Sequence, residues 1–203
     1  MLICGIDEAG RGPLAGPVVA SAVIIDQECL EDRLIDGVTD SKLLSEEERE
    51  HFYAEIIDKC TSYSVSIIHS KVIDKINILR ATMRAMEQSI DRLERKPDKI
   101  FIDGNYFRLE KEREKTLNYE TVVKGDSKIF AISCASIIAK VTRDRIMNEL
   151  HEVFPVYNFI SHKGYASREH IDTIRENGLS EIHRKSFCRK IFEYNYRFDF
   201  DEK

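Results

Sequence analysis

Hydrophobic residues recur along the chain with two spacings, which together predict a mixture of strands and helices. Five short runs are rich in β-branched residues or alternate between apolar and polar positions, as is typical of strands. They are Leu2–Asp7, Pro17–Ile25, Tyr63–His69, Lys99–Asp103 and Tyr119–Val123. Four longer stretches carry apolar residues at helical spacing. They are Glu46–Lys59, Lys71–Arg95, Ser127 to about Glu152, and Arg168–Asn177. Strands followed by alternating strands and helices predict an α/β layered fold.

Local signals predict several of the boundaries. Ser45 followed by Glu48 is a capping-box pattern, so a helix is expected to begin directly after Ser45. Ser70 is expected to cap the long helix that follows, and Pro97 is expected to end it. The segment Pro155–Ala166 is expected to be a loop.

Composition narrows the class of protein. The 203-residue chain is 42% hydrophobic and 33% charged, which suits one folded domain and excludes a disordered or collagen-like protein. No apolar run approaches the roughly 20 residues that span a bilayer, and the start lacks a signal-peptide pattern. We therefore expect a cytoplasmic protein that does not bind membranes. Five cysteines, odd in number and far apart, predict reduced thiols instead of disulfides or a zinc site.

Charge is unevenly distributed. The net charge of −5 argues mildly against a nucleic-acid partner. Residues 26–58, however, hold twelve acidic and three basic residues, a net −9, so the remainder carries +4. Basic residues gather near the end of the chain, interleaved with aromatic ones; they are Arg184, Lys185, Arg189, Lys190 and Arg197. This cluster is equally consistent with a solvated surface and with a phosphate-binding edge.

Four carboxylates follow predicted strands. Asp7 and Glu8 come at the end of the first strand, Asp103 closes another, and Asp126 follows the last strand through Lys124-Gly125. Taken singly, Asp126 is more readily a helix N-cap and Asp103 a turn former. Taken together, four carboxylates at strand ends can converge at one sheet edge. A set of oxygen ligands without His or Cys favours Mg²⁺ or Mn²⁺, and two such ions suit in-line displacement at phosphorus.

A series of sequence blocks resembles the ribonuclease HII family. The first is the glycine-rich GIDEAGRGPLAGP at residues 5–17, which joins the first two predicted strands. The others, in the family's order, are DSKLLS (40–45), IDGN (102–105), VVKGD (122–126), ISCASIIAKVTRD (132–144), SHKGYAS (161–167) and HRKSF (183–187). The blocks extend over nearly the whole chain, so the resemblance is specific.

The resemblance implies a fold and an activity. The expected fold is a ribonuclease H-like mixed five-stranded sheet flanked by helices, with a small helical C-terminal extension. It implies one catalytic domain over residues 1–203, in which residues 155–203 contact the substrate. The family is an endoribonuclease family that cuts the RNA strand of RNA–DNA hybrids. It also incises duplex DNA 5′ to a single embedded ribonucleotide, as in ribonucleotide excision repair, and leaves 3′-hydroxyl and 5′-phosphate ends.

The resemblance also assigns roles at the acidic centre. Asp7, Glu8, Asp103 and Asp126 match the family's four catalytic and metal-binding residues, which hold two Mg²⁺ or Mn²⁺ ions when substrate is bound. Asp126 completes the surroundings of the second ion. Residues 10–12, which are Gly10, Arg11 and Gly12, match the loop that senses the ribose. Glycines suit that task because backbone groups can approach a 2′-hydroxyl closely only where side chains are absent.

Further substrate contacts follow from the same comparison. Tyr165 matches the tyrosine that stacks on the sugar beside the ribonucleotide. Ser41 and Lys42 match a contact to the phosphate backbone, and Lys140 is a further phosphate candidate.

Five other residues of the matching blocks are given lesser roles. Ser136, Arg143 and Asp144 are expected to be structural. His162 and His183 are secondary candidates for general acids, because the chemistry can run on a water activated by metal.

Two alternatives stay open beside a ribonuclease that acts on RNA–DNA hybrids and ribonucleotide-containing DNA. One is another ribonuclease H-like nuclease, such as a junction resolvase; the glycine loop and Tyr165 argue against it. The other is a nucleic-acid-binding protein without catalysis, against which all four acidic positions are filled. A monomer is expected.

Overall fold

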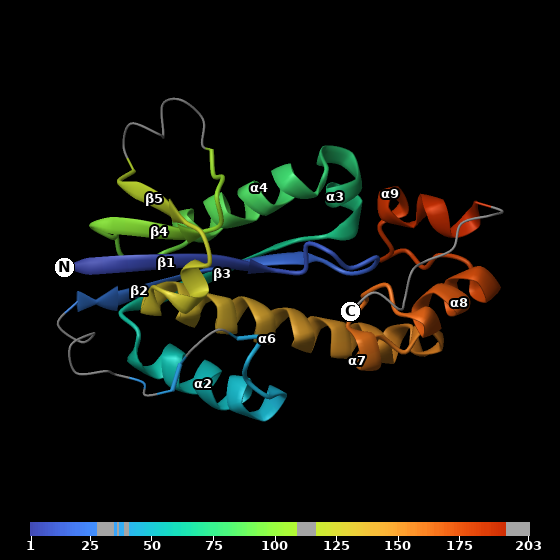
Figure 1. The fold of residues 1–203 in the computed structure, drawn as a ribbon, viewed down its shortest axis with the longest axis horizontal. Helices are drawn as coiled ribbons and strands as arrows, with labels where there is room; N and C mark the ends of the chain where they lie inside the picture. Colours follow the sequence, from blue (N-terminus) through green and yellow to red (C-terminus); the bar gives the residue numbers. More distant parts are fainter. Residues whose placement is uncertain (28–34, 36, 39–40, 109–116, 194–203) are drawn as a thin grey trace.

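The fold is built on one mixed five-stranded sheet. The computed structural model describes residues 1–27, 35, 37–38, 41–108 and 117–193. The strands are β1 (Leu2–Ala9), β2 (Val18–Asp26), β3 (Ser62–Ile68), β4 (Lys99–Asp103) and β5 (Tyr119–Val122). Their order is β3-β2-β1-β4-β5 (Figure 1). The pairs β1–β2 and β2–β3 are antiparallel, whereas β1–β4 and β4–β5 are parallel. The expected mixed sheet flanked by helices is confirmed.

Helices cover both faces of the sheet. On one face lie α3 (Ser70–Ile76) and α4 (Ile78–Asp91), and on the other lie α6 (Phe130–Val153) and, outside it, α2 (Glu46–Lys59) (Figure 1). A 3₁₀ turn, Gly125–Ser127, precedes α6. The expected capping box is present, because the Ser45 side chain accepts from the Glu48 N–H and the Glu48 side chain accepts from the Ser45 N–H.

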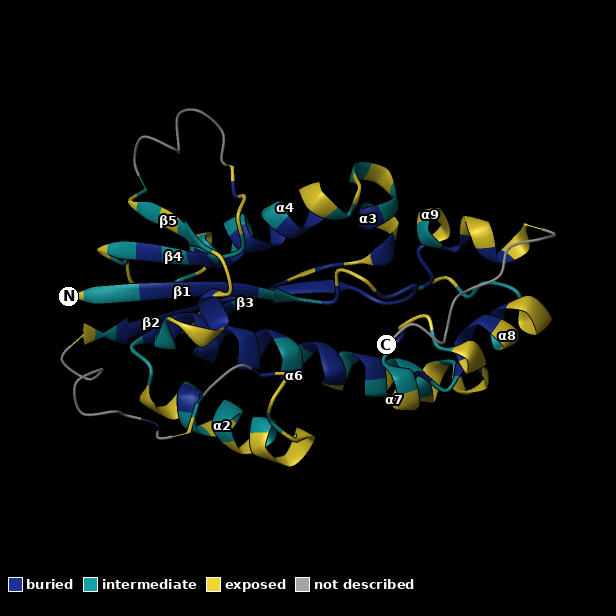
Figure 2. Ribbon diagram, viewed as in Figure 1, coloured by how far each residue is buried: buried dark blue, intermediate teal, exposed yellow. Residues whose placement is uncertain are grey.

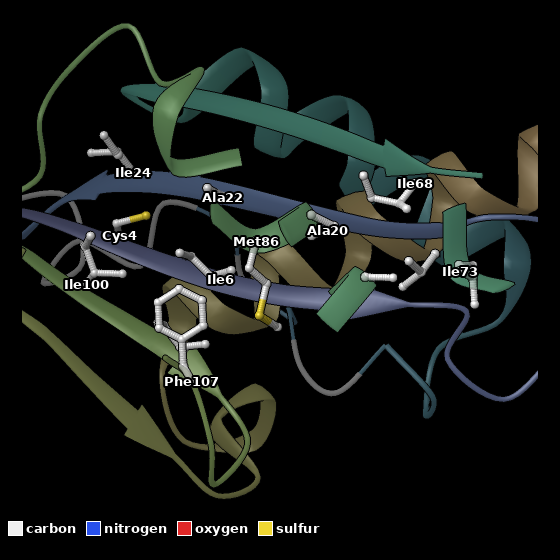
Figure 3. Packing of buried hydrophobic residues seen from close by; sticks show 14 residues of the cluster. Cys4, Ile6, Ala20, Ala22, Ile24, Ile68, Ile73, Met86, Ile100 and Phe107 are labelled. Carbon is white, nitrogen blue, oxygen red and sulfur yellow. The ribbon is translucent and has the colours of Figure 1, made fainter. Parts of the chain in front are cut away.

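Each face of the sheet buries its own hydrophobic cluster. Between the sheet and α4 lie Cys4 and Ile6 of β1 together with Met86 and Phe107 (Figure 3). The other face packs onto α6, and the contact is so close that a Cβ atom at Gly5 would lie 2.0 Å from the backbone of Ala131. The inward surfaces of both layers are buried, and exposed residues lie on the outer sides of the helices, α2 and α4 among them (Figure 2).

A third cluster joins the glycine-rich loop to the C-terminal part of the chain. That part contains the 3₁₀ turn Pro155–Tyr157, α7 (Phe159–His162), α8 (Arg168–Asn177), α9 (Lys185–Cys188) and the 3₁₀ turn Arg189–Phe192. Leu14 and Ala15 of the loop pack with Met147, Phe159 and Ile171. The loop is therefore braced from two directions, by the sheet and by the C-terminal helices.

Four details differ from the sequence predictions. The single helix expected over 71–95 is two helices that break at Asn77 and end at Asp91, and His69, not Ser70, occupies the N-cap. The expected loop over 155–166 contains a 3₁₀ turn and α7. The first strand continues to Ala9, so that Asp7 and Glu8 lie within it.

The cysteines and the helices agree with the composition of the chain. Cys4, Cys60, Cys134 and Cys188 are free thiols, and Cys29 lies outside the described residues. Among the described residues, no helix is long and apolar enough to cross a membrane.

Candidate active site

Most of the residues singled out in the sequence line one cleft of about 370 Å³. Three carboxylates, the glycine loop and one aromatic ring face it together with two lysines and two serines. The lining includes Asp7, Glu8, Gly10, Arg11, Gly12, Ser41, Lys42, Asp103, Ser136, Lys140 and Tyr165. Asp126 does not line the cleft itself, but its carboxylate lies 3.1 Å from the Lys42 ammonium, which does. The structure thus brings together residues up to 158 positions apart in sequence.

The uneven lengths of β1 and β4 create the acidic end of the cleft. Their parallel register pairs Ile6 with Ile102, and β4 ends one residue later at Asp103. Asp7 therefore lies level with Asp103, and because β1 continues to Ala9, Glu8 extends beyond the end of β4. Successive side chains of a strand point to opposite faces. Both can reach this notch because, among the described residues, β2 still pairs with β1 here but the pairing of β1 with β4 has ended.

The surroundings of Asp7 disfavour the charged form of its carboxyl group. The residue is 6% exposed, and burial raises its pKa well above the ordinary value, with further increases from the negative charges of Glu8 and Asp103. Hydrogen bonds from the Ser136 side chain and from the Glu8 N–H oppose this increase, the latter at 2.7 Å. A buried carboxylate beside two like charges strongly favours a bound cation.

Glu8, unlike Asp7, lies beside a positively charged side chain, that of Arg11. Burial raises the pKa of Glu8, and the nearby Arg11 guanidinium, whose Nη1 lies 3.2 Å from Glu8 Oε1, counteracts that effect. Arg11 is itself largely exposed and comes from the glycine loop. The acidic centre and the loop are therefore in direct contact before any substrate binds.

Asp103 and Asp126 are held by the turn that precedes α6. The Gly125 N–H donates to Asp103 Oδ1 at 2.7 Å, and the Ser133 hydroxyl donates to the backbone carbonyl of Asp126 at 2.6 Å. Asp126 lies in the 3₁₀ turn, and the N-cap of α6 is Ile129, so the interpretation of Asp126 as a helix N-cap is wrong.

The four carboxylates supply the oxygen donors that a hard divalent cation prefers. In this structure no three acidic, histidine or cysteine side chains of the described residues form a ready-made metal cluster. Arg11 and Lys42 instead occupy positions beside Glu8 and Asp126. The raised pKa of Asp7 nevertheless marks an uncompensated negative site, which fits a bound cation.

The glycine loop presents a bare backbone to the cleft. Gly10 adopts a φ of +92°, a conformation that side chains rarely permit, and an added Cβ would lie 2.1 Å from Arg143 Nε. Gly12 has no such constraint, since an added Cβ would meet only Tyr165 Cε1 at 3.7 Å. The absence of a side chain at Gly12 leaves room in the cleft beside Tyr165, a residue that is 47% exposed.

Comparison with known proteins decides the family. The family model described as ribonuclease HII matches residues 4–190. A protein named ribonuclease HII from Francisella tularensis subsp. mediasiatica is 49% identical over 187 residues, which cover 92% of this chain and 95% of that protein. A second, from Caldicellulosiruptor saccharolyticus, is 48% identical over 189 residues, which cover 93% of this chain and 88% of that protein.

The chain belongs to the ribonuclease HII family. The crystal structure of ribonuclease H2 from Pyrococcus horikoshii OT3 superposes with a TM-score of 0.77 at 31% identity, covering 94% of this chain and 97% of that one. The ribonuclease H-like fold is confirmed, and the chain is an endoribonuclease of the ribonuclease H2 type. A junction resolvase or a non-catalytic binding protein is not favoured.

Within this ribonuclease HII cleft, the serines and Lys140 show how the wall is assembled. The hydroxyls of Ser41 and Ser136 lie 2.8 Å apart and join the segment before α2 to α6. Lys140 Nζ contacts both carboxylate oxygens of Asp144, at 2.7 and 2.6 Å. The sequence prediction gave Ser136 no part in the site, yet it contacts Asp7; small residues along the inner face of α6 were the available signal.

The basic cluster near the end of the chain is not one surface. Arg184 is fully buried, so the interpretation of this residue as part of a phosphate-binding edge is wrong. Arg189 and Lys190 are exposed, and Arg197 lies outside the described residues.

Two histidines considered as general acids do not line the cleft. His162 and His183 pack with His170 and Phe159 among the C-terminal helices. Burial lowers the pKa of His183 to about 4, with a smaller decrease due to His170, and burial also lowers the pKa of His162. Neutral, buried imidazoles in this position are structural.

Proposed function

We propose that this member of the ribonuclease HII family hydrolyses the RNA strand of RNA–DNA hybrids and incises duplex DNA 5′ to a single embedded ribonucleotide. The products carry 3′-hydroxyl and 5′-phosphate ends. The observation that carries the proposal is the juxtaposition, in one cleft, of the acidic centre with a bare glycine loop and an exposed tyrosine. Such a cleft combines phosphodiester chemistry with recognition of a sugar.

The acidic residues would hold two divalent cations, Mg²⁺ or Mn²⁺. Asp7, Glu8 and Asp103 are the principal ligands in this proposal, and Asp126 completes the set. Bound cations would supply activation of the attacking water and stabilisation of the leaving oxygen. Asp7, buried and destabilised by its acidic neighbours, gains most from a cation. Ser136 orients Asp7 through its hydrogen bond.

The glycine loop and Tyr165 would recognise the ribonucleotide. A 2′-hydroxyl both donates and accepts hydrogen bonds, and backbone groups of residues 10–12 can approach it because Gly10 and Gly12 have no side chain. Tyr165 would stack on the neighbouring sugar. Arg11, which is exposed at the edge of the loop, would add a contact to phosphate.

The rest of the substrate would be held through its phosphates. Ser41, Lys42 and Lys140 face the cleft, and the cationic ends of the two lysines would contact the backbone on either side of the cut. In this proposal the enzyme acts as a single-domain monomer, and its C-terminal extension, residues 155–203, contributes Tyr165 to the substrate surface.

The proposal is tested by replacing Asp7 with Asn. Asp7→Asn should reduce cleavage of an RNA–DNA hybrid in Mg²⁺ or Mn²⁺ by more than about a hundredfold, because a ligand matters more than the groups that merely orient it. Binding of the hybrid should change little, since phosphate contacts supply most of the affinity. Asp98→Asn, which alters an acid far from the cleft that accepts from the Leu2 N–H, is the control and should cleave normally. An active Asp7→Asn enzyme would contradict the proposal.

A further inference from the structure

Two buried guanidinium groups lie behind the glycine loop. Arg143 of α6 and Arg184, which precedes α9, are 1% and 0% exposed. Their hydrogen bonds go to backbone carbonyls of residues 10–17. Arg184 donates to the carbonyls of Gly10 (2.7 Å), Arg11 (2.9 Å), Gly16 (3.0 Å) and Pro17 (3.0 Å). Arg143 donates to the carbonyls of Pro17 (3.1 Å) and Ala15 (3.2 Å).

Holding the loop with two buried charges has a high cost in desolvation free energy. Neither guanidinium forms an ion pair with a carboxylate in the part of the chain that the structure describes. Burial and the neighbouring Arg143 lower the pKa of Arg184 to about 9, so Arg184 is still charged at neutral pH. Burying a charge without an ion-pair partner is costly. Here the carbonyl dipoles offset much of that cost, and the negative charges of Asp144 and Asp74 add to their effect. Neutral side chains could pack behind the loop at a lower cost in desolvation free energy. The two charges are therefore better explained by an effect on the cleft than by stability alone.

Peptide geometry shows what the arrangement does to the loop. In a trans peptide the N–H points opposite to the C=O. Because Arg184 draws the carbonyls of Gly10 and Arg11 inward, the N–H groups of Arg11 and Gly12 point away from it. Residues 10–12 line the cleft, and these two N–H groups have no acceptor among the described residues. The buried positive charge also strengthens these donors by polarising the peptides.

Arg143 connects the loop to the second part of the ribose site. Its side chain fills the space that a Cβ atom at Gly10 would need, and its guanidinium carbon lies 5.7 Å from the centroid of the Tyr165 ring. Backbone bonds reinforce this connection, since the N–H of Leu14 donates to the carbonyl of Gly164 at 2.8 Å and the N–H of Arg184 donates to the carbonyl of Leu14 at 2.7 Å. The loop and Tyr165 are therefore fixed relative to one another.

We propose that Arg143 and Arg184 are positioning residues for sugar discrimination: they hold the loop from behind, keep the Arg11 and Gly12 N–H groups directed into the cleft, and align Tyr165 with them. The inference rests on the proposed function, because it assumes that this face of the cleft contacts the ribonucleotide. Neither arginine touches the substrate. Their contribution is to the difference in affinity between ribose and deoxyribose, more than to the affinity for the duplex as a whole.

The test compares two duplexes of the same sequence, one all-DNA and one with a single ribonucleotide, bound in Ca²⁺ by fluorescence anisotropy. For Arg184→Met and Arg143→Met, the preference for the ribonucleotide duplex should fall about tenfold, the loss of one or two hydrogen bonds to the sugar. Affinity for the all-DNA duplex should stay within about threefold of the unaltered protein, because the phosphate contacts persist. Arg92→Met is the matched control, since Arg92 also donates to a backbone carbonyl, that of Val65 at 2.8 Å, but far from the cleft.

Arg184→Lys and Arg143→Lys keep the charge but lose the fork of donors, and they guard against variants that do not fold. They should show an intermediate loss of preference with a cooperative thermal transition. Folded variants that retain the full preference would overturn the proposal, as would an equal loss of affinity for both duplexes. Failure of both Arg184 variants to fold, while Arg143→Lys folds with full preference, would also overturn it. If the unaltered protein shows no preference, the proposed function itself fails, which is a separate outcome.

Discussion

Two glycines of the same loop are needed for different physical reasons. Gly10 has a positive φ and lies against Arg143, so the fold requires it. Gly12 has neither constraint, and an added methyl group would project beside Tyr165 into open cleft. The loop conformation therefore explains Gly10, whereas the space needed for a substrate sugar explains Gly12.

This difference predicts opposite results for two alanine substitutions. Gly10→Ala should lower the free energy of unfolding by about 1–3 kcal/mol, because it adds backbone strain and a clash. Gly12→Ala should change stability by less than about 0.5 kcal/mol, yet reduce cleavage at a ribonucleotide sharply, because the methyl group occupies the place of the sugar. Thermal unfolding and single-turnover cleavage measure the two effects. A fully active Gly12→Ala enzyme would show that the sugar lies elsewhere.

At the scale of elements, a chain of neutral histidines joins α8 to the segment that carries Tyr165. The carbonyl of Tyr165 can only accept, so His170 Nδ1 donates to it at 2.8 Å, and His170 Nε2 must then accept from His183 Nε2 at 3.0 Å. His183 Nδ1 is left to accept from the Ser180 N–H at 3.0 Å. The second and third links each require an unprotonated acceptor nitrogen, on His170 and on His183 respectively, so protonation of either ring breaks the chain.

Stability should therefore depend on pH through this chain. Burial lowers the pKa of His170 and of His183 to about 4, below the value of about 6.5 in an unfolded chain. Because the folded pKa is depressed, the stabilisation is fully present above pH 6.5 and is lost as the pH falls towards 4, by at most about 3 kcal/mol for each histidine.

Urea unfolding of the unaltered protein and of His183→Asn at pH 7.5, 6.0 and 5.0 measures this dependence. The stability advantage of the unaltered protein over His183→Asn should shrink as the pH falls. His51→Gln, which changes an exposed histidine of α2, should leave the pH dependence unchanged. An advantage that stays constant or grows on acidification would contradict the assignment of neutral rings.

The break between α3 and α4 is a second feature at this scale. Asn77 adopts φ 64° and ψ 165°, a region populated almost entirely by glycine, while its side chain caps α4 by accepting from the Arg80 N–H at 3.1 Å. The break leaves α3 beside α9 (Figure 1), where Asp74 accepts from the N–H groups of Lys185 and Ser186 at 2.9 and 3.0 Å.

We expect Asn77→Gly to raise the free energy of unfolding by about 1 kcal/mol, since it relieves strain and loses little as an N-cap. Asn77→Ala should lower it by about 1 kcal/mol, because the cap is lost and the strain remains. Equilibrium denaturation of both variants checks the signs. A destabilised Asn77→Gly protein would mean that the backbone at this position is not strained.

At the scale of the whole molecule, the sequence predicted the strands, the main helices and the residues of the acidic centre. It did so because alternation, helical periodicity and the motif blocks are local signals. It could not predict the break at Asn77, since the apolar pattern continues through it. Nor could it distinguish the buried Arg184 from its exposed neighbours. The contact that buries Arg184 is with Gly10, which lies 174 positions earlier in the sequence, and no local pattern reveals such a contact.

The net charge of the chain was also a poor guide to its partner. The overall −5 weighed against nucleic acid as a partner, but four acidic residues belong to the candidate centre and a net −9 is confined to residues 26–58. The distribution of charge, and not its sum, is consistent with a phosphate-bearing substrate.

Recognition of a ribose in this cleft should determine where the enzyme cuts nucleic acid. The most direct test offers the enzyme two DNA duplexes of identical sequence, one with a single ribonucleotide, in Mg²⁺ or Mn²⁺, and maps the cut on a sequencing gel. We expect one incision on the 5′ side of the ribonucleotide, with 3′-hydroxyl and 5′-phosphate ends, and no incision of the all-DNA duplex. Equal cutting of both duplexes, or cutting of neither, would contradict it.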